Sequence, residues 1–371
     1  MGPLISTMKT HHRPLAAVLQ PFIDTQSLAG AVLLVADRNG ILDLETVGYA
    51  DVAARKPMRP NSLFWIASQT KSMTATALMM LVDEGKVKVT DPVHRYLPEF
   101  KDQRVAIPRG KSDLLLRKPK QSITLRHILS HTSGLPFKSA IEEPTRDMIP
   151  LATTVRSYAM TPLQFEPGAR YLYSNAGINT AGRIIEVVSG LSYETFMQRR
   201  LLEPLGMTDT AFKPDARRLQ RLAKAYKPDA AKTGLEETLF SQYTRPFDNP
   251  ARQAVPGGGL FSTAADVAQF CRMILNGGTL DGMSYVTTEA IRQMTRKQTG
   301  RAVETGYGLG WGVGAGTFGH GGALATNMTI DHKRGLILVF LVQHMGFPGN
   351  GNLAQAAFQD AARERFGSSG P

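Results

Sequence analysis

The sequence predicts an α+β fold in which one sheet is assembled from both ends of the chain around a helical insertion. Patterns typical of strands, rich in β-branched and apolar residues, occur near both ends. They cover Ala29–Val35, Ile41–Val47, Leu309–Val313, Thr326–Ile330 and Leu336–Val342. Between residues 91 and 255, by contrast, prolines are scattered, charge is higher and the short regular segments are helical. We therefore expect a sheet domain formed by residues 1–90 and 256–371, interrupted by a helical domain at 91–255.

Local signals predict the individual elements. Asn39-Gly40, between the first two strand patterns, predicts a tight hairpin turn. Ser68–Glu84 predicts a helix that is buried on nearly all sides, because apolar residues occur around most of its circumference. Gly85 is a suitable C-terminal cap for that helix. Further helices are predicted at Leu125–Ser130, Ala176–Val188, Ala264–Leu275 and Leu353–Arg365.

The composition limits the class of protein. The chain has 371 residues, of which 42% are hydrophobic and 20% charged, as in an ordinary globular protein. The single cysteine, Cys271, excludes a disulfide framework and any multi-cysteine metal site. No apolar run reaches the ~20 residues of a membrane span, and the N-terminus lacks the pattern of a secretory signal. The chain as given is expected to be cytoplasmic, or periplasmic or exported if a signal has been removed.

The chain is strongly basic, with a formal net charge of +12. Its basic residues cluster at Arg104–Arg126 and Lys213–Lys232, without interleaved aromatics or a nucleic-acid-binding motif. We therefore expect no nucleic-acid partner. Solvated surface faces are the simple interpretation, and attraction of anionic polymers such as cell-wall material is the alternative.

The first chemical signal is Ser68-Gln69-Thr70-Lys71, at the start of the buried helix. A spacing of three places Ser68 and Lys71 on one helix face, about one turn apart. A serine hydroxyl is a weak nucleophile until a base takes its proton, and a desolvated lysine amine with a lowered pKa can be that base. Alternatively, Ser68 only caps the helix and Lys71 extends its ammonium to solvent.

Two later segments carry groups suited to the same chemistry. Tyr173-Ser174-Asn175 precedes a predicted helix. A tyrosine near a lysine ammonium can ionise below its usual pKa or relay a proton, and Asn175 can donate and accept hydrogen bonds. Taken alone, Asn175 could be a helix cap and Tyr173 a packed aromatic. The other segment is Gly319-His320-Gly321-Gly322. Its glycines have no side chains, so a substrate could lie along a strand edge there. The alternative is a glycine-rich turn with an incidental histidine.

In this order along the chain, the three segments resemble the motifs of penicillin-recognising serine hydrolases. The chain is similar to the class C β-lactamase family in the broad sense, which includes family VIII carboxylesterases, serine D-aminopeptidases and DD-peptidases. Other matching segments span most of the chain: FWIASQTK at Phe64–Lys71, ILSHTSGL at Ile128–Leu135, FEPG at Phe165–Gly168, EPLGMTDT at Glu203–Thr210, GGGLFSTAAD at Gly257–Asp266 and YGLGW at Tyr307–Trp311.

The resemblance implies a β-lactamase/transpeptidase-like fold, in which an antiparallel sheet with flanking helices packs against an all-helical domain. The active site would lie between the two. Ser68 would be the nucleophile, and Lys71 and Tyr173 would share the roles of base and acid. Asn175 would contact the substrate or hold Lys71, and Gln69 is placed with the substrate-binding residues.

The resemblance also implies the opposite wall of the site. His320, Gly321 and Gly322 would line it. The backbone N–H groups of Ser68 and Ala323 would form an oxyanion hole. The reaction would be acyl transfer through an acyl-serine intermediate followed by hydrolysis, with no cofactor and no metal.

One residue departs from the pattern of many β-lactamases in this family, which have lysine in place of His320. That lysine helps to bind the substrate carboxylate, whereas histidine is mostly neutral above pH ~6.5. We therefore predict a serine hydrolase of esters or small amides, most similar to carboxylesterases. The alternatives are a D-amino-acid peptidase or DD-peptidase, a weak class C-type β-lactamase, and a non-catalytic binding protein on the same scaffold. The expected partner is a small-molecule ester, amide or β-lactam; the sequence does not predict the oligomeric state.

One further pair of residues has a spacing that suits a metal. His127 and His131 are four residues apart, as zinc ligands on a helix can be. No glutamate of an HExxH motif accompanies them, and the segment matches the family resemblance. No metal site is therefore predicted.

Overall fold

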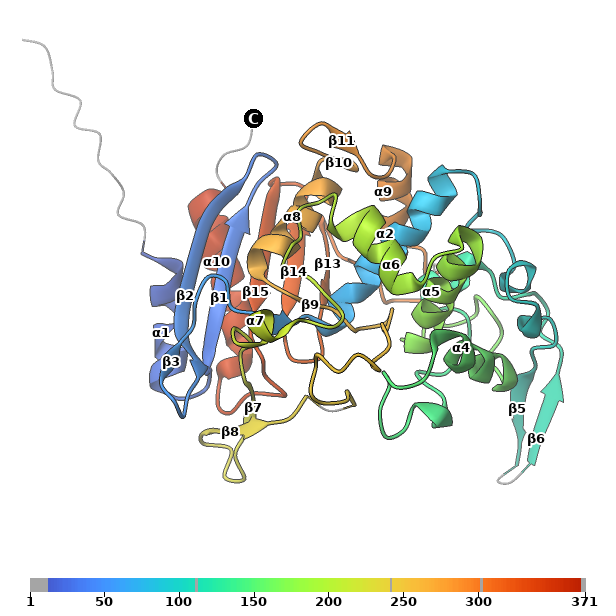
Figure 1. Ribbon diagram of the computed structural model, residues 1–371, viewed down its shortest axis with the longest axis horizontal. Helices are drawn as coiled ribbons and strands as arrows, with labels where there is room; N and C mark the ends of the chain where they lie inside the picture. Colours follow the sequence, from blue (N-terminus) through green and yellow to red (C-terminus); the bar gives the residue numbers. More distant parts are fainter. Residues whose placement is uncertain (1–12, 111–112, 241, 301–302, 368–371) are drawn as a thin grey trace, which may run out of the picture.

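A seven-stranded antiparallel sheet built from both ends of the chain forms one side of the molecule, as the computed structural model of residues 13–110, 113–240, 242–300 and 303–367 shows (Figure 1). The N-terminal strands lie directly beside the C-terminal ones, because β1 pairs with β15. In sheet order the strands are β12 (Gly312–Val313), β13 (Thr317–Gly321), β14 (Asn327–Asp331), β15 (Leu336–Leu341), β1 (Gly30–Ala36), β2 (Ile41–Asp51) and β3 (Lys56–Pro57). The prediction of one sheet built from both ends of the chain is confirmed.

Helices cover both faces of this sheet. Side chains alternate between the faces along a strand, so Leu33 of β1 packs in the core beneath α1 (Leu15–Asp24) and α10 (Ala354–Phe366). Its neighbour Leu34 points to the opposite face, where α8 (Ala264–Leu275) packs. Every residue of β1 is buried for this reason.

The central helix α2 (Thr70–Asp83) packs against α5 (Asn175–Ser189) and α9 (Thr288–Thr295). All residues from Thr70 to Leu81 are buried, as the apolar sequence predicted. Ser68 lies in a 3-10 turn, Ala67–Gln69, immediately before this helix. Ala67 has a left-handed φ of 46°, a conformation that is costly for a residue with a side chain. The chain therefore turns sharply where Ser68 is presented.

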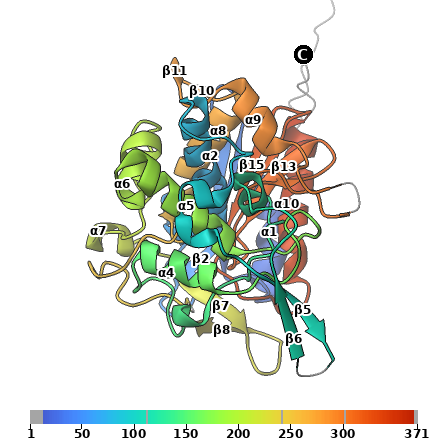
Figure 2. The same ribbon diagram turned by 90° about the vertical axis from the view of Figure 1, so that its right-hand side faces the viewer.

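The middle of the chain contains helices and also two β-hairpins (Figure 2). The expectation of an all-helical segment is wrong in this respect. Both hairpins contain a proline and charged residues, and β5 and β6 are also exposed on much of their surface, so the hairpins lack the alternating pattern that identifies a half-buried strand. The helices are α3 (Leu125–Leu129), α4 (Leu151–Met160), α5, α6 (Tyr193–Met197) and α7 (Ala216–Leu219), and the hairpins are β5 (Val105–Arg109) with β6 (Asp113–Arg117) and β7 (Ala225–Pro228) with β8 (Leu235–Thr238).

Two short strand pairs complete the structure. β4 (Phe64–Trp65) pairs with β9 (Phe261–Ser262), and β10 (Thr279–Leu280) pairs with β11 (Met283–Ser284). The first pair ties the segment before Ser68 to the segment after the glycine run Gly257–Gly259. β13 was not predicted as a strand, because its sequence TFGHG is rich in glycine.

One hydrophobic core extends from the sheet through α2 into the helices of the middle segment. The two predicted domains therefore share a core, and their boundaries at 90/91 and 255/256 stay a prediction. No helix in the described ranges is long and apolar enough to cross a membrane.

Candidate active site

Ser68 and Lys71 meet at the beginning of α2. The Lys71 Nζ lies 3.0 Å from the Ser68 Oγ and also donates a hydrogen bond to the carbonyl oxygen of Gly257. Lys71 is fully buried, whereas Ser68 is partly exposed between the buried residues Ala67 and Gln69. The hydroxyl is therefore accessible from outside while the amine beside it is shielded from water.

The environment of Lys71 favours a neutral amine. Burial, and to a lesser extent the charge of Arg146, lowers the pKa of Lys71 well below its ordinary value. Within the described residues no carboxylate forms an ion pair with this amine. A neutral amine that donates to the Gly257 carbonyl retains a lone pair, which can accept the proton of the Ser68 hydroxyl.

Tyr173 faces the same two residues. Its ring centroid lies 4.8 Å from the Lys71 Nζ. Burial raises the pKa of Tyr173 well above its usual range, and a hydrogen bond with the Ser68 hydroxyl lowers it by less. Of the two possibilities for this tyrosine, the raised pKa favours relay of a proton over ionisation below the usual pKa. Tyr173 is a neutral phenol that can donate a proton.

The segment Tyr173-Ser174-Asn175 is fixed at the N-terminus of α5. Ser174, not Asn175, is the N-cap: its Oγ accepts from the Gly177 N–H at 3.1 Å and donates to the Pro136 carbonyl at 2.6 Å. Asn175 is buried, and its Oδ1 has no hydrogen-bond partner among the described residues. That oxygen lies only 3.1 Å from where a Cβ on Gly257 would be. The partner that holds Lys71 is thus Gly257, beside Asn175, and not Asn175 itself.

His131, interpreted above as half of a zinc-like pair, positions this segment instead. Its Nδ1 accepts a hydrogen bond from the Ser174 N–H at 3.1 Å. Its ring centroid lies 4.5 Å from that of Tyr173 and 4.6 Å from that of Tyr307. The Nδ1 of His127 accepts from the Thr124 N–H at 3.2 Å, so it caps α3. The described residues contain no group of three His, Cys, Asp or Glu suited to a metal.

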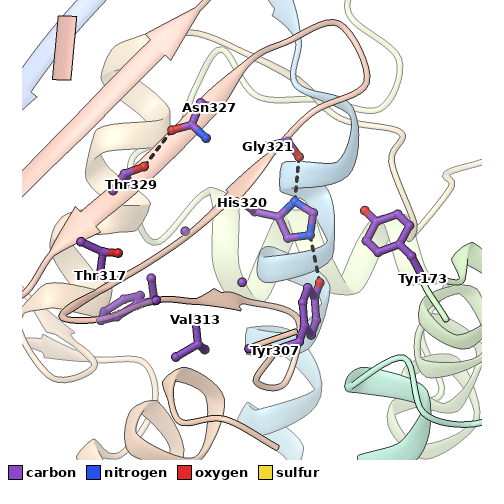
Figure 3. Close-up of a pocket in the computed structure, with 13 residues that line it drawn as sticks. Tyr173, Tyr307, Val313, Thr317, His320, Gly321, Asn327 and Thr329 are labelled. Carbon is purple, nitrogen blue, oxygen red and sulfur yellow. Dashed lines mark hydrogen bonds between the residues drawn. The ribbon is translucent and has the colours of Figure 1, made fainter. Parts of the chain in front are cut away.

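The opposite wall is strand β13, which carries His320 (Figure 3). The Nδ1 of His320 is 2.7 Å from the Gly321 carbonyl oxygen, which can only accept, so Nδ1 carries the hydrogen. The Nε2 then accepts from the Tyr307 hydroxyl at 2.9 Å. Burial, together with the nearby Lys71, lowers the pKa of His320 to about 3. His320 is therefore neutral, and the Gly321 carbonyl is the group that fixes its tautomer.

The end of β13 approaches the backbone just before Ser68. A Cβ on Gly322 would lie 2.2 Å from the Thr326 Oγ1 and 2.6 Å from the Ile66 carbonyl oxygen. Only glycine allows this contact. It brings the following residue, the exposed Ala323, close to the turn that carries Ser68. The oxyanion hole formed by the N–H groups of Ser68 and Ala323 stays a prediction that this approach favours.

A cleft of about 460 Å³ lies beside Tyr173 and His320 (Figure 3). Among the described residues, its lining contains no Asp, Glu, Lys or Arg. Gly321 belongs to this lining, whereas Gln69 does not. The Gln69 side chain is fully buried, and neither polar atom of its amide has a hydrogen-bond partner in the described residues. The lining residues are Tyr173, Gly306, Tyr307, Gly312, Val313, Gly314, Thr317, Phe318, Gly319, His320, Gly321, Asn327 and Thr329.

The Beta-lactamase family profile matches residues 15–362, nearly the whole chain. The chain belongs to this family. It is 32% identical over 363 residues to Protein Rv1367c of Mycobacterium tuberculosis (strain ATCC 25618 / H37Rv), with 88% of this chain and 89% of that protein covered. It is 29% identical over 395 residues to esterase EstB of Burkholderia gladioli, with 95% of each chain covered.

The fold is also shared with known structures. EstCE1, described as a hydrolase with promiscuous acyltransferase activity, aligns with a TM-score of 0.76 over 94% of this chain and 97% of that chain, at 24% identity. The β-lactamase-type α+β fold predicted from the sequence is confirmed, and so is the prediction that the protein is a serine hydrolase. The roles of individual residues and the substrate stay predictions.

Proposed function

We propose that this protein is a carboxylesterase that cleaves esters with an uncharged alcohol part, through an acyl-serine intermediate. The observation that carries the proposal is that no described residue lining the cleft beside Tyr173 and His320 carries a formal charge. A leaving group in that cleft meets a neutral imidazole, hydroxyl groups, an amide and glycine backbone. EstB of Burkholderia gladioli, a relative over nearly the whole chain, is named an esterase, which agrees with this proposal.

In acylation, the neutral Lys71 amine takes the proton of Ser68 as its Oγ bonds to the ester carbonyl carbon. The carbonyl oxygen becomes an oxyanion, which the N–H groups of Ser68 and Ala323 stabilise. As the intermediate collapses, the bond to the alcohol oxygen breaks. Tyr173 gives its proton to that oxygen and regains one from the Lys71 ammonium.

In deacylation, water attacks the acyl-serine. The Lys71 amine accepts the proton of the water, and Tyr173 gives its proton to the Ser68 Oγ and regains one from the Lys71 ammonium. The products are a carboxylic acid and an alcohol, and the enzyme is regenerated without a cofactor.

The neutral cleft disfavours substrates that carry a carboxylate on this side of the scissile bond. A carboxylate transferred from water needs a cation or several hydrogen bonds to replace its hydration. The described lining residues provide no cation, and the pKa of His320, about 3, keeps this residue uncharged at neutral pH. β-Lactams and peptides ending in D-alanine carry such a carboxylate, so we expect them to be poor substrates.

A panel of substrates tests this proposal. We expect p-nitrophenyl butyrate to be hydrolysed with a much higher kcat/KM than nitrocefin or a peptide ending in D-Ala-D-Ala. D-alanine p-nitroanilide, an uncharged amide on the leaving side, tests the amidase alternative. A higher kcat/KM for the D-Ala-D-Ala peptide than for the ester would contradict the proposal.

A labelling experiment tests the acyl-serine step separately. The intact mass should increase by one adduct after treatment with a fluorophosphonate, and Ser68→Ala should abolish the adduct. A folded wild-type protein that is not labelled and hydrolyses none of the panel would instead support the non-catalytic binding protein.

A further inference from the structure

The β5–β6 hairpin has an apolar face that is open to solvent in the described part of the chain. In the antiparallel register, Pro108 lies opposite Leu114 and Ala106 lies opposite Leu116. Side chains alternate along a strand and directly opposite residues share a face, so these four residues are on the same face. Leu114 is 63% exposed and Leu116 49%. The hairpin projects from the end of the molecule that is far from the seven-stranded sheet (Figures 1 and 2).

Basic residues are frequent in this hairpin and in the segments directly before and after it. Residues 101–120, without positions 111–112, contain six Lys or Arg and two Asp. Lys118 and Lys120, which follow β6, are exposed. Asp113 lies opposite Arg109 on the other face of the hairpin. In the described residues, Arg117 is the only cation of this segment that forms an ion pair, and its partner is Glu166. The hairpin and its flanking segments thus carry an excess of positive charge, and the exposed Lys118 and Lys120 follow directly after the apolar residues of β6.

We propose that this hairpin surface, formed by β5, β6, Lys118 and Lys120, docks the protein reversibly on an anionic lipid surface. Exposed leucines can enter the boundary between lipid headgroups and acyl chains, where their apolar area leaves water. Lysine and arginine near an anionic leaflet are attracted by its negative potential. Both contributions come from one projecting element, so a flat surface can engage them together.

Other occupants fit these observations less well. A second copy of the chain, related by two-fold symmetry, would place the basic residues of one hairpin near those of the other. Two leucines also provide far less than the ~800 Å² per partner of a stable protein interface. A nucleic acid or an anionic polysaccharide would use the cations but leave the leucines in water, and the hairpin has no aromatic residue on which bases could stack.

Vesicle co-sedimentation of the full chain tests the proposal. The protein should sediment with vesicles of phosphatidylglycerol and phosphatidylcholine, not with phosphatidylcholine alone, and less at higher salt. Leu114→Ser with Leu116→Ser should weaken binding about tenfold or more, because apolar burial is lost. Lys118→Gln with Lys120→Gln should weaken it about 30-fold at low salt, because each cation contributes about a fivefold factor.

Matched controls separate the hairpin from general surface properties. Leu239→Ser changes a leucine that is 62% exposed, and Arg217→Gln with Lys232→Gln removes two exposed cations of the other basic cluster. Both controls should bind vesicles more tightly than the hairpin variants. Ser68→Ala should bind like the wild type, and the hairpin variants should hydrolyse a soluble ester normally, so this test is independent of the proposed activity.

Three outcomes would overturn the proposal. One is no sedimentation with phosphatidylglycerol vesicles at low salt. Another is equal sedimentation of the wild type and the two hairpin variants. The third is a dimer in light scattering that Leu114→Ser with Leu116→Ser converts to a monomer, without any lipid binding, which would make a second copy the occupant.

Discussion

The two walls of the candidate active site are built by different means. On the side of α2 and Tyr173, polar side chains are buried and fixed by hydrogen bonds, and burial shifts the pKa values of Lys71 and Tyr173 in opposite directions. On the side of β13, glycine lets two backbones approach closely, and the titratable side chain of this strand, His320, is neutral. The first wall thus suits proton transfer, and the second suits substrate alignment and selection. Substitutions on the two walls should therefore differ in kind and in size.

The largest effect is expected from Lys71→Ala, which removes the proposed base. We expect kcat/KM for a neutral ester to fall about 10⁴-fold. In the wild type, kcat/KM should fall as the pH decreases through the lowered pKa of Lys71, because protonation removes the lone pair. This limb of the pH profile should be absent from the residual activity of the variant.

Lys88→Ala, an exposed lysine beyond the end of α2, is the matched control and should leave kcat/KM unchanged. Thermal unfolding of both variants checks the fold. A folded Lys71→Ala enzyme with nearly wild-type kcat/KM would remove Lys71 from the mechanism.

The next largest effect is expected from Tyr173→Phe. The substitution keeps the ring, which packs on His131, and removes the hydroxyl that faces Ser68. Loss of a proton donor to the leaving alcohol should lower kcat about 10³-fold. The loss should be smaller for p-nitrophenyl esters than for alkyl esters, because nitrophenolate leaves without a proton.

Tyr171→Phe is the control, since Tyr171 packs on the same histidine from another side. Equal kcat values for Tyr173→Phe and Tyr171→Phe would mean that Tyr173 only packs. Steady-state kinetics with ethyl and p-nitrophenyl esters of one acid makes the comparison.

On the second wall, Gly322→Ala should move the end of β13 away from the turn that carries Ser68. The added Cβ would meet the Thr326 Oγ1 and the Ile66 carbonyl oxygen at distances no real Cβ adopts. We expect a loss of about 10² in kcat, the effect of displacing one oxyanion donor. Gly40→Ala, where an added Cβ meets nothing within 4 Å, is the control. An unchanged kcat in a folded Gly322→Ala enzyme would show that the position of the end of β13 does not contribute to catalysis.

The same contrast explains how much the sequence could predict. Ser68 and Lys71 are recognisable because both lie on one short helical segment, whose spacing is a local property. The hydrogen bond from Lys71 to Gly257 joins residues 186 positions apart. Every residue has a backbone carbonyl group, so residue type does not reveal which carbonyl accepts this bond. The sequence identifies the imidazole of His131, but it does not identify its partner, because that partner is the backbone N–H of Ser174. Strand β13 was missed because closely approaching backbones require glycine, which removes the pattern of a strand.

The smallest effect is expected from His320→Lys, which changes selectivity and not the chemical step. A lysine here would add a cation to a cleft in which no described lining residue is a cation. We compare kcat/KM for nitrocefin, which carries a carboxylate on the leaving side, with kcat/KM for a neutral ester. The ratio of the first value to the second should rise about tenfold, as one charge-assisted hydrogen bond allows. His94→Lys adds the same charge outside the cleft lining and should not change this ratio. If the ratio stays constant in a folded His320→Lys enzyme, substrate charge is selected elsewhere, and the neutral wall does not define the substrate.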